Sequence, residues 1–361
     1  MANAEPKCAD AVKPAGPRSG SLSKVLAVAA VVLLVALGLW RLSLEGDKPV
    51  AYTHQPVGVM STDCDITVVT AANRHNDARR ALHQAEAQLR NVQARMNVFL
   101  EHSELWNFNA APAGEKIQLS PETLAVLLSA RRINLLSEGA FDVTILPMIR
   151  LWKAAPQTGQ PPSDDELAQA RAASSWDLIS LASDGATKKS PSVEIDLGGI
   201  AKGFAVDQAL EALKSAGADG GMVNLGGNIR VFGKTPEGLP WTIGVRNPFQ
   251  SGPDAGVIAQ VVLTDEAIAT SAHYYRYVRI GDRSYSHIID PRSGRPAQRA
   301  ASVTVIARTA MEADGWSTAL AVLGPAGMRL LPDGVDAMLI AGDEHSHKVL
   351  ATQGFSARLV K

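Results

Sequence analysis

The chain has 361 residues, enough for one large domain or for two ordinary ones. Charged residues make up 20% of the sequence and leave a formal net charge of -1, which gives no electrostatic reason to expect nucleic acid as a partner. The two cysteines, Cys8 and Cys64, are too few for a disulfide framework, and no Cys-His motif indicates a zinc site.

The first part of the chain carries a targeting signal. Residues 1–23 are rich in Pro, Ala and Lys and are expected to form a disordered cytoplasmic tail. Residues 25–40 contain no charged side chain, and with their flanks they predict a transmembrane anchor over residues 24–44. Basic residues precede this segment, so the positive-inside rule predicts a single-pass inner-membrane protein with its bulk on the periplasmic side. A cleaved signal peptide is the less favoured alternative, because no small-x-small site follows.

The rest of the chain predicts one compact domain over residues 57–361, joined to the anchor by a linker over residues 45–56. Apolar stripes and end signals predict helices over residues 77–96, 121–138, 200–215 and 313–323. Alternation of apolar and polar residues predicts strands over residues 193–197, 222–232, 241–245, 257–263 and 303–307. These elements follow no regular βαβ period, which favours an α+β fold over a doubly wound sheet.

The segment DLGGIAKGFAVD, residues 196–207, predicts a strand, a glycine pair and a helix N-terminus in succession. The free N–H groups of the first turn, the helix dipole and the ammonium group of Lys202 would together attract a phosphate. The spacing is neither a Walker A loop nor a G-x-G-x-x-G motif, so a generic dinucleotide fold is not indicated. On its own the segment also fits a tight strand-to-helix turn that binds nothing.

The segment ADGWST, residues 313–318, places Asp314 and Thr318 four residues apart on one face of a predicted helix. A carboxylate and a hydroxyl are hard oxygen donors that suit Mg²⁺ when a carbonyl and substrate phosphates complete the shell. Taken alone, an Asp early in a helix more often serves the dipole or the cap.

The segment SHIIDPRSGRP, residues 286–296, predicts a short strand followed by a turn. The strand delivers His287 to the edge of the turn, close in sequence to Asp290. Histidine can accept a proton at neutral pH, which suits a general base, although a single histidine is more often structural.

In their order along the chain, these segments and several shorter ones resemble the ApbE family, the FAD:protein FMN transferases, over nearly all of residues 57–361. The matching pieces are MST at 60–62, MNVF at 96–99, SEL at 103–105, Asn109, GAFDVT at 139–144, Pro147, LW at 151–152, DLGGIAKGFAVD, NLGGN at 224–228, TS at 270–271, SHIIDPRSGRP and ADGWST. The resemblance implies a single mixed, T-fold-like catalytic domain.

The resemblance also implies a reaction: Mg²⁺-dependent transfer of the FMN moiety of FAD onto a Ser or Thr hydroxyl of a target flavoprotein subunit, with release of AMP. The implied metal ligands are Asp314, Thr318 and the backbone carbonyl near Gly199. His287 is the candidate base, with Asp290 as an orienting group. The implied lining of the flavin-nucleotide site is Met60, Phe99, Ala140, Phe141, Asp142, Asp196, Lys202 and His287.

The implied partners are flavin-acceptor subunits of membrane electron-transport complexes outside the cytoplasm. Two other functions stay open: a metal-dependent FAD pyrophosphatase that gives FMN and AMP, and a non-enzymatic flavin-binding protein. The set of Asp314, Thr318 and His287 disfavours the second, because a flavin reservoir needs neither a metal nor a base. The sequence departs from the family pattern at Ser61, where glycine is usual, and at residues 97–99, where Asn-Val-Phe replaces Ser-Thr-Tyr.

Overall fold

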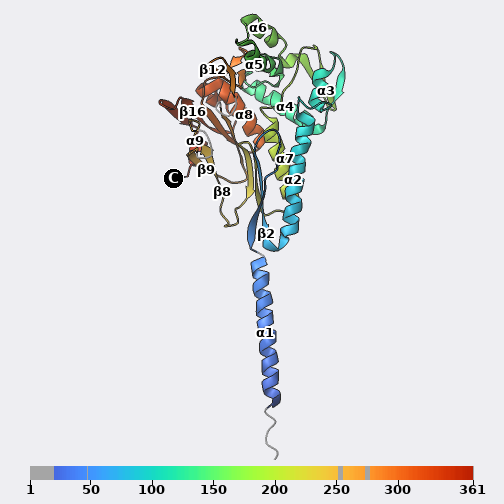
Figure 1. Ribbon diagram of the computed structural model, residues 1–361, viewed down its shortest axis with the longest axis vertical. Helices are drawn as coiled ribbons and strands as arrows, with labels where there is room; N and C mark the ends of the chain where they lie inside the picture. The colour runs from blue at the N-terminus through green and yellow to red at the C-terminus, as the bar shows by residue number, and fades with distance from the viewer. Residues whose placement is uncertain (1–19, 47, 251–254, 273–276, 361) are drawn as a thin grey trace, which may run out of the picture. The chain divides into compact units, whose positions relative to one another are not determined.

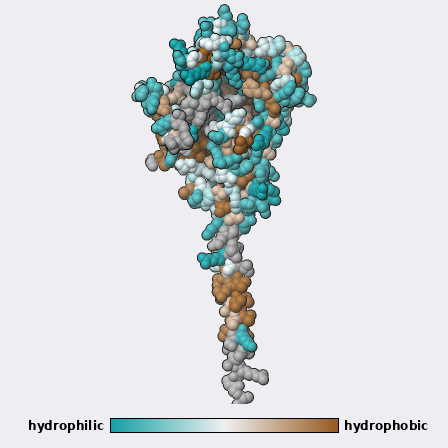
Figure 2. Space-filling view, viewed as in Figure 1, coloured by the Kyte–Doolittle hydropathy of each residue, from teal (hydrophilic) through white to brown (hydrophobic). Residues whose placement is uncertain are grey.

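The computed structural model describes residues 20–46, 48–250, 255–272 and 277–360, in two units, Met1–Lys48 and Pro49–Lys361. In the first unit, residues 20–46 form the helix α1 (Gly20–Gly46), and its described side chains are exposed and mostly apolar (Figure 2). Searched over the described residues, the structure offers no helix with the length and apolar character needed to cross a membrane. Residues 1–19 of the expected tail lie outside the described residues.

The residues after α1 include a strand that the sequence did not predict. β1 (Pro49–His54) pairs antiparallel with β2 (Cys64–Ala71). Tyr52 packs against the core, and its hydroxyl donates a hydrogen bond to the Ala72 carbonyl at 3.2 Å. The linker prediction is therefore wrong for residues 49–54. A short edge strand with alternating exposure carries too few buried side chains to stand out in the sequence.

β1 is the edge strand of a large antiparallel sheet. Within the described residues this sheet has eight strands in the order β1-β2-β6-β7-β10-β15-β16-β17. Every neighbouring pair in it is antiparallel. The neighbours β2 and β6, β7 and β10, and β10 and β15 are not consecutive strands of the chain, so other elements lie between them in the sequence. The strands after β2 are β6 (Gly220–Leu225), β7 (Asn228–Gly233), β10 (Ala267–Ala272), β15 (Ser302–Ala307), β16 (Asp336–Gly342) and β17 (His347–Ala351).

The two faces of the sheet bury separate cores, because successive side chains of a strand point to opposite sides. In β2, Val68 belongs to the core under the helices and Val69 to the core on the other face. Figure 1 shows the arrangement of the covering elements. One face is covered by α2 (His75–Met96), α7 (Ala201–Ser215) and α8 (Ala310–Leu323), and the other by the hairpin of β8 (Trp241–Arg246) and β9 (Val257–Leu263) with α9 (Gln353–Ala357).

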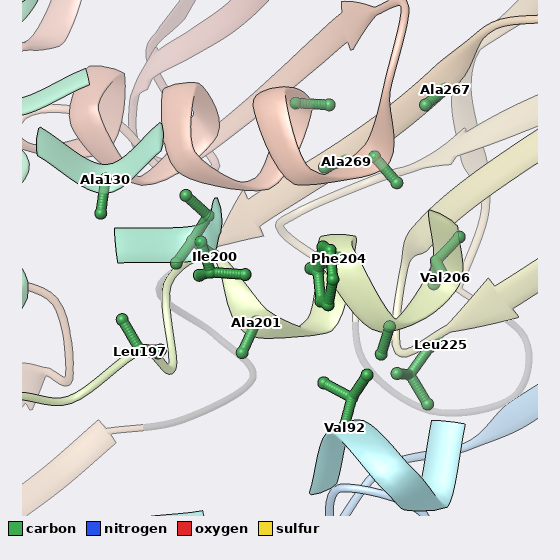
Figure 3. Close-up of a cluster of buried hydrophobic side chains, with 14 of the residues drawn as sticks. Val92, Ala130, Leu197, Ile200, Ala201, Phe204, Val206, Leu225, Ala267 and Ala269 are labelled. Carbon is green, nitrogen blue, oxygen red and sulfur yellow. The ribbon is translucent and has the colours of Figure 1, made fainter. Parts of the chain in front are cut away.

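The larger core holds the start of α7 in place. Figure 3 shows Val92 of α2, Ile200 and Phe204 at the α7 end and Leu225 of β6 in the same cluster of buried side chains. Ile200 and Leu225 have no exposed surface, and Phe204 is 6% exposed. Burial of one such side chain stabilises the fold by about 1.5–3 kcal/mol, so the N-terminus of α7 has a fixed position.

The remaining elements form smaller layers around this frame. Trp152, Ile280 and Ile289 belong to a third core, which joins α5 to the late hairpins. The elements in question are α3 (Glu104–Ala110), β3 (Lys116–Gln118), α4 (Pro121–Leu136), α5 (Leu146–Thr158), α6 (Asp164–Ala172), β4 (Ile179–Ala182), β5 (Gly185–Lys188), β11 (Tyr277–Ile280), β12 (Arg283–Ser286), β13 (Ile289–Asp290) and β14 (Arg295–Pro296). Short 3-10 helices add η1 (Ala72–Arg74), η2 (Val143–Ile145), η3 (Trp176–Leu178) and η4 (Gly324–Leu330).

Most predicted elements are confirmed, and two differ in kind. Residues 222–232 form two strands, β6 and β7, because Gly226 and Gly227 both have positive φ angles and close a tight hairpin. Residues 193–197 alternate in burial as predicted but belong to no strand. The side chain of Asn109 donates to the Ile195 carbonyl at 2.9 Å and accepts from the Ile195 N–H at 2.8 Å, which replaces the missing strand neighbour.

Candidate functional site

The glycine pair before α7 lies against α8. The Thr318 hydroxyl of α8 donates to the Gly199 carbonyl at 3.4 Å. A Cβ atom at Gly199 would lie 3.2 Å from the Thr318 hydroxyl oxygen and 3.2 Å from the Phe141 ring. A larger residue would make these neighbouring side chains shift by a few tenths of an ångström. Glycine at this position favours the close approach of the backbone to the hydroxyl, because it has no side chain.

Asp314 lies beside this loop on the same helix face as Thr318. It is 3% exposed, and one of its carboxylate oxygens accepts a hydrogen bond from the Gly203 N–H at 3.0 Å. The Lys202 ammonium group lies 3.4 Å from both oxygens of Asp314 and donates to the Gly198 carbonyl at 3.0 Å. The structure thus brings Lys202 and the three predicted metal ligands into one constellation.

The donor set of this constellation fits Mg²⁺. A carboxylate, a hydroxyl and a backbone carbonyl are all hard oxygen ligands. Two oxygens in adjacent positions around one Mg²⁺ at about 2.0–2.1 Å stand roughly 3 Å apart. The Thr318 and Gly199 oxygens, at 3.4 Å, are already close to that spacing. We call Asp314, Thr318 and Gly199, with Lys202, the oxygen site.

The first turn of α8 is held by Asp207, whose role the sequence did not reveal. Its carboxylate accepts hydrogen bonds from the N–H groups of Ala310 and Met311, at 2.8 and 2.9 Å, and pairs with Arg230 at 3.1 Å. Burial raises the pKa of Asp207 to about 6, which still leaves the group mainly ionised at neutral pH. Gly203 lies one turn earlier on α7, and a Cβ there would come within 2.1 Å of the Ala310 carbonyl oxygen. Asp207 and Gly203 together fix α8 against α7.

The segment GAFDVT borders the oxygen site through Phe141. Ala140 and Phe141 are 1% and 3% exposed, so they would contribute to a flavin site mainly through backbone and shape. Asp142 accepts hydrogen bonds from the N–H and hydroxyl of Thr144, at 2.8 and 2.7 Å. Burial raises the pKa of Asp142, while these hydrogen bonds and the Asn134 amide act in the opposite direction.

Asp196 shapes the loop that leads into the glycine pair. Its carboxylate accepts a hydrogen bond from the Gly198 N–H at 2.6 Å, and its own N–H donates to the Val143 carbonyl at 2.8 Å. The loop is therefore tied to the GAFDVT segment on one side and to α8 on the other. Two of the predicted binding residues, Asp196 and Lys202, thus have direct contacts in the loop around Gly198.

Met60 and Phe99 contact other parts of the chain. The Met60 N–H donates to the Gln93 side chain at 2.7 Å, and Met60 and Ser61 both adopt positive φ angles that non-glycine residues rarely take. Phe99 is 69% exposed, and the Lys153 ammonium lies 4.5 Å from the centre of its ring. An exposed aromatic ring can stack on a planar ligand, which keeps Phe99 a candidate for the flavin.

His287 is exposed between β12 and β13. Both oxygens of Asp290 accept hydrogen bonds from the Arg292 guanidinium, each at 2.9 Å. The turn that follows is anchored by Trp152, whose indole N–H donates to the Gly294 carbonyl at 2.8 Å. Asp290 therefore stabilises the turn through Arg292, and its predicted role in orienting His287 stays a prediction.

The comparisons with known proteins show the family to which the chain belongs. A model of the ApbE family matches residues 60–339. The chain belongs to the ApbE family. It is 33% identical over 334 residues to the FAD:protein FMN transferase of Vibrio cholerae, covering 91% of this chain and 99% of that protein. It is 39% identical over 249 residues to the one of Haemophilus influenzae, covering 67% of this chain and 72% of that protein.

Solved structures of ApbE proteins share the fold. The flavin transferase ApbE from Vibrio cholerae superposes with a TM-score of 0.76 at 32% identity, covering 86% of this chain and 100% of the other. The flavinyl transferase ApbE from Pseudomonas stutzeri gives a TM-score of 0.73 at 30% identity, covering 86% and 97%. The family predicted from the motifs, its mixed α+β fold and the expectation of an enzyme are confirmed.

Two further residues support the site in this ApbE-family chain and were missed as functional. Asn109 was part of the matching motifs without an assigned role, and it holds residues 193–197 by a paired amide contact. Lys188 is 1% exposed and donates to the carbonyls of Asn109, Pro191 and Val193, at 2.6, 3.2 and 3.4 Å. Burial lowers the pKa of Lys188. No local pattern in the sequence marks a lysine whose ammonium group donates to three backbone carbonyls.

Proposed function

We propose that this chain transfers the FMN moiety of FAD to a Ser or Thr hydroxyl of a target flavoprotein subunit in a Mg²⁺-dependent reaction that releases AMP. The observation that carries the proposal is the oxygen site, where the Gly199 carbonyl and the Thr318 hydroxyl, 3.4 Å apart, lie beside the buried carboxylate of Asp314. The names of the ApbE relatives support the same class of reaction.

The chain's own residues supply the positioning for this chemistry. Lys202 carries a positive charge beside Asp314 and the Gly198 carbonyl, at the start of α7, where a diphosphate is attracted by the ammonium and by the helix dipole. Mg²⁺ at the oxygen site would screen the diphosphate charge and stabilise the departing phosphate of AMP. A protein hydroxyl is a weak nucleophile until a base accepts its proton, and His287 is the proposed base.

In the proposed step, the acceptor oxygen forms a bond to the phosphorus of the FMN moiety while the bond from this phosphorus to the bridging oxygen of FAD breaks. The hydroxyl proton passes to His287, and AMP leaves with the bridging oxygen. The products are a phosphoester between FMN and the acceptor, and free AMP. If water occupied the acceptor position, the same step would give FMN and AMP, which is the pyrophosphatase alternative.

One experiment separates these outcomes. The purified full-length chain is incubated with FAD, Mg²⁺ and a candidate acceptor subunit, and the acceptor mass and the nucleotide products are measured. We expect a covalent FMN adduct with an equal amount of AMP, and no adduct when a chelator removes the metal. Free FMN without an adduct would favour the pyrophosphatase, and unchanged FAD would favour a flavin-binding protein. The control is an acceptor whose target hydroxyl residue is replaced by alanine.

We further propose that the domain acts outside the cytoplasm on subunits of membrane electron-transport complexes, with α1 as the membrane attachment. The uncharged residues 25–40 and the basic residues before them support this location. Two measurements on separate samples test it: alkaline extraction of isolated membranes, and protease digestion of intact spheroplasts. Recovery of the chain in the soluble fraction, or protection of the domain in spheroplasts, would contradict the proposal.

A further inference from the structure

A second group of metal-ligand side chains, made up of other residues, lies outside the oxygen site. His54 ends β1, and His83 and Glu86 stand one turn apart on α2. One potential ligand atom from each of the three residues lies within 4.8 Å of the others. The sequence separates His54 from His83 by a strand, a turn and the start of a helix, and the antiparallel pairing of β1 with β2 brings them together.

We propose that His54, His83 and Glu86 form a binding site for a divalent transition-metal ion of the zinc type. Two imidazole nitrogens and one carboxylate oxygen are a donor set that binds Zn²⁺, Ni²⁺ or Co²⁺ and that a hard ion such as Mg²⁺ disfavours. Three protein ligands leave at least one coordination position for water or an external ligand. We call these three residues the nitrogen site.

The spacing of the ligand atoms fits one ion after small side-chain movements. Ligand atoms bound to one zinc ion at about 2.0–2.2 Å stand roughly 3–3.5 Å apart. The His54 Nε2 atom and a Glu86 oxygen are 2.7 Å apart, slightly closer than this, and the widest separation in the group is at most 4.8 Å, slightly wider. The rings of His54 and His83 meet edge to face, with 5.4 Å between their centres. Small rotations of the three side chains, none of which is fully buried, would bring the ligand atoms to the spacing that one zinc ion needs.

The surroundings already orient the carboxylate. The Arg90 guanidinium binds one Glu86 oxygen at 2.7–2.8 Å, while the other oxygen faces His54. Arg90 also donates to the Val57 carbonyl at 3.2 Å, which fixes its position. Hydrogen bonds to one oxygen of a carboxylate fix the direction in which its other oxygen can bind a metal ion. The contact of His54 with Glu86 would be exchanged for a shared bond to the ion.

The ion would connect two elements that otherwise meet through few side chains. β1 is the edge strand of the sheet and α2 is the long helix that covers it. A ligand that binds only the folded state raises its stability by mass action. Binding at this site should therefore raise the melting temperature of the domain and slow hydrogen exchange in β1, with no requirement for FAD.

The chain contains a matched control for this site. His75 is also an exposed histidine of α2 that meets an aromatic ring of β1 edge to face, Tyr52 at 5.3 Å between ring centres. It is not part of the metal-ligand group found among the described residues. The variants His83→Ala and His75→Ala therefore remove similar ring contacts, while only the first removes a ligand of the proposed site.

The test titrates Zn²⁺ into the full-length chain by calorimetry in excess Mg²⁺, which keeps the oxygen site occupied, and measures bound zinc after desalting. We expect one zinc ion per chain in the wild type and in His75→Ala, and a loss of affinity of more than about 100-fold in His83→Ala and in Glu86→Gln. Co²⁺ should give the visible absorption bands of nitrogen-ligated cobalt in the wild type and in His75→Ala, but not in His83→Ala. Melting curves in chelator check that each variant folds.

Three results would overturn the proposal. Zinc binding of equal affinity and stoichiometry in wild type, His83→Ala and Glu86→Gln would place the ion elsewhere. A loss in His75→Ala as large as that in His83→Ala would indicate a general effect on α2. An absence of stoichiometric zinc in the wild type would leave the three side chains as an ordinary ion pair with a neighbouring histidine. None of these results depends on the transferase activity.

Discussion

The oxygen site and the nitrogen site differ in how deeply the fold supports them. Asp314 is 3% exposed, and its helix is fixed by Asp207 and by the close contact at Gly203. His83 is exposed, and His54 is only half-buried. A buried carboxylate next to a lysine has no water to solvate it and depends on its partners, whereas exposed imidazoles are solvated with or without an ion. Disturbing the first site should therefore affect both chemistry and folding, and disturbing the second should affect only metal binding and the stability that the bound metal adds.

The largest expected effect is that of Asp314→Asn. The substitution removes the charged ligand of the oxygen site, and loss of several kcal/mol of transition-state stabilisation corresponds to a decrease on the order of 10⁴-fold in FMN transfer. The measurement is the initial rate of acceptor flavinylation at saturating FAD and Mg²⁺. Circular dichroism and a melting curve serve as the control for folding. A variant that is folded and fully active would exclude Asp314 as a metal ligand.

A smaller loss of activity is expected for His287→Ala. Loss of a general base typically lowers a rate by about 10²–10⁴-fold, and His287 lies outside the buried helix contacts, so FAD affinity should change little. Flavin fluorescence titration and single-turnover transfer rates separate the two effects. The role of His287 as a base fails if the transfer rate equals that of the wild type. A parallel loss of FAD affinity and rate would instead make it a binding residue.

The support of the oxygen site can be tested by Gly203→Ala. The added methyl group would come within 2.1 Å of the Ala310 carbonyl oxygen, so α7 and α8 must separate. Overpacking of this kind costs about 1–3 kcal/mol, and more where backbone atoms have to move. We expect a melting temperature several degrees lower and a weaker dependence of activity on Mg²⁺. An unchanged melting temperature would show that the contact between α7 and α8 can accommodate a methyl group.

The smallest effect is expected for His83→Ala in metal-free buffer. The side chain is exposed, and surface substitutions of this kind change the free energy of unfolding by no more than about 0.5 kcal/mol. FMN transfer with Mg²⁺ should equal that of the wild type. Chemical denaturation and the flavinylation assay check both statements. A loss of transfer in this variant would mean that the two sites are coupled and that the contrast between them is wrong.

Sequence patterns predicted the helices and motifs whose stabilising residues lie within the same segment. The apolar stripe of α2 and the cap of α4, where the Ser120 hydroxyl accepts from the Thr123 N–H, lie within the segments that they stabilise. The spacing of Asp314 and Thr318 in ADGWST predicted their shared helix face. The glycine pair at 198–199 was correctly placed at the start of α7.

Features that depend on distant partners could not be predicted. Asp207 caps a helix that begins 103 residues later in the chain, and the partner N–H groups leave no local mark. β1 was missed because its pairing with β2 decides its structure more than its own composition does. The nitrogen site follows from that same pairing, since the register that sets Thr53 opposite Thr67 also fixes His54 at the end of the strand. Without the strand, nothing in the sequence connects His54 with His83 and Glu86, which share one turn of α2.

The paired amide contact of Asn109 makes the loop before α7 sensitive to deamidation of this residue. Its side chain imitates a peptide group, with one donor and one acceptor aimed at Ile195. Deamidation would exchange the donor for an oxygen that faces the Ile195 carbonyl, so two acceptors would then repel each other. The loop that carries Asp196 and Gly199 would lose its hold while the large sheet stayed intact. A preparation that slowly loses activity without unfolding should therefore be examined for aspartate at residue 109.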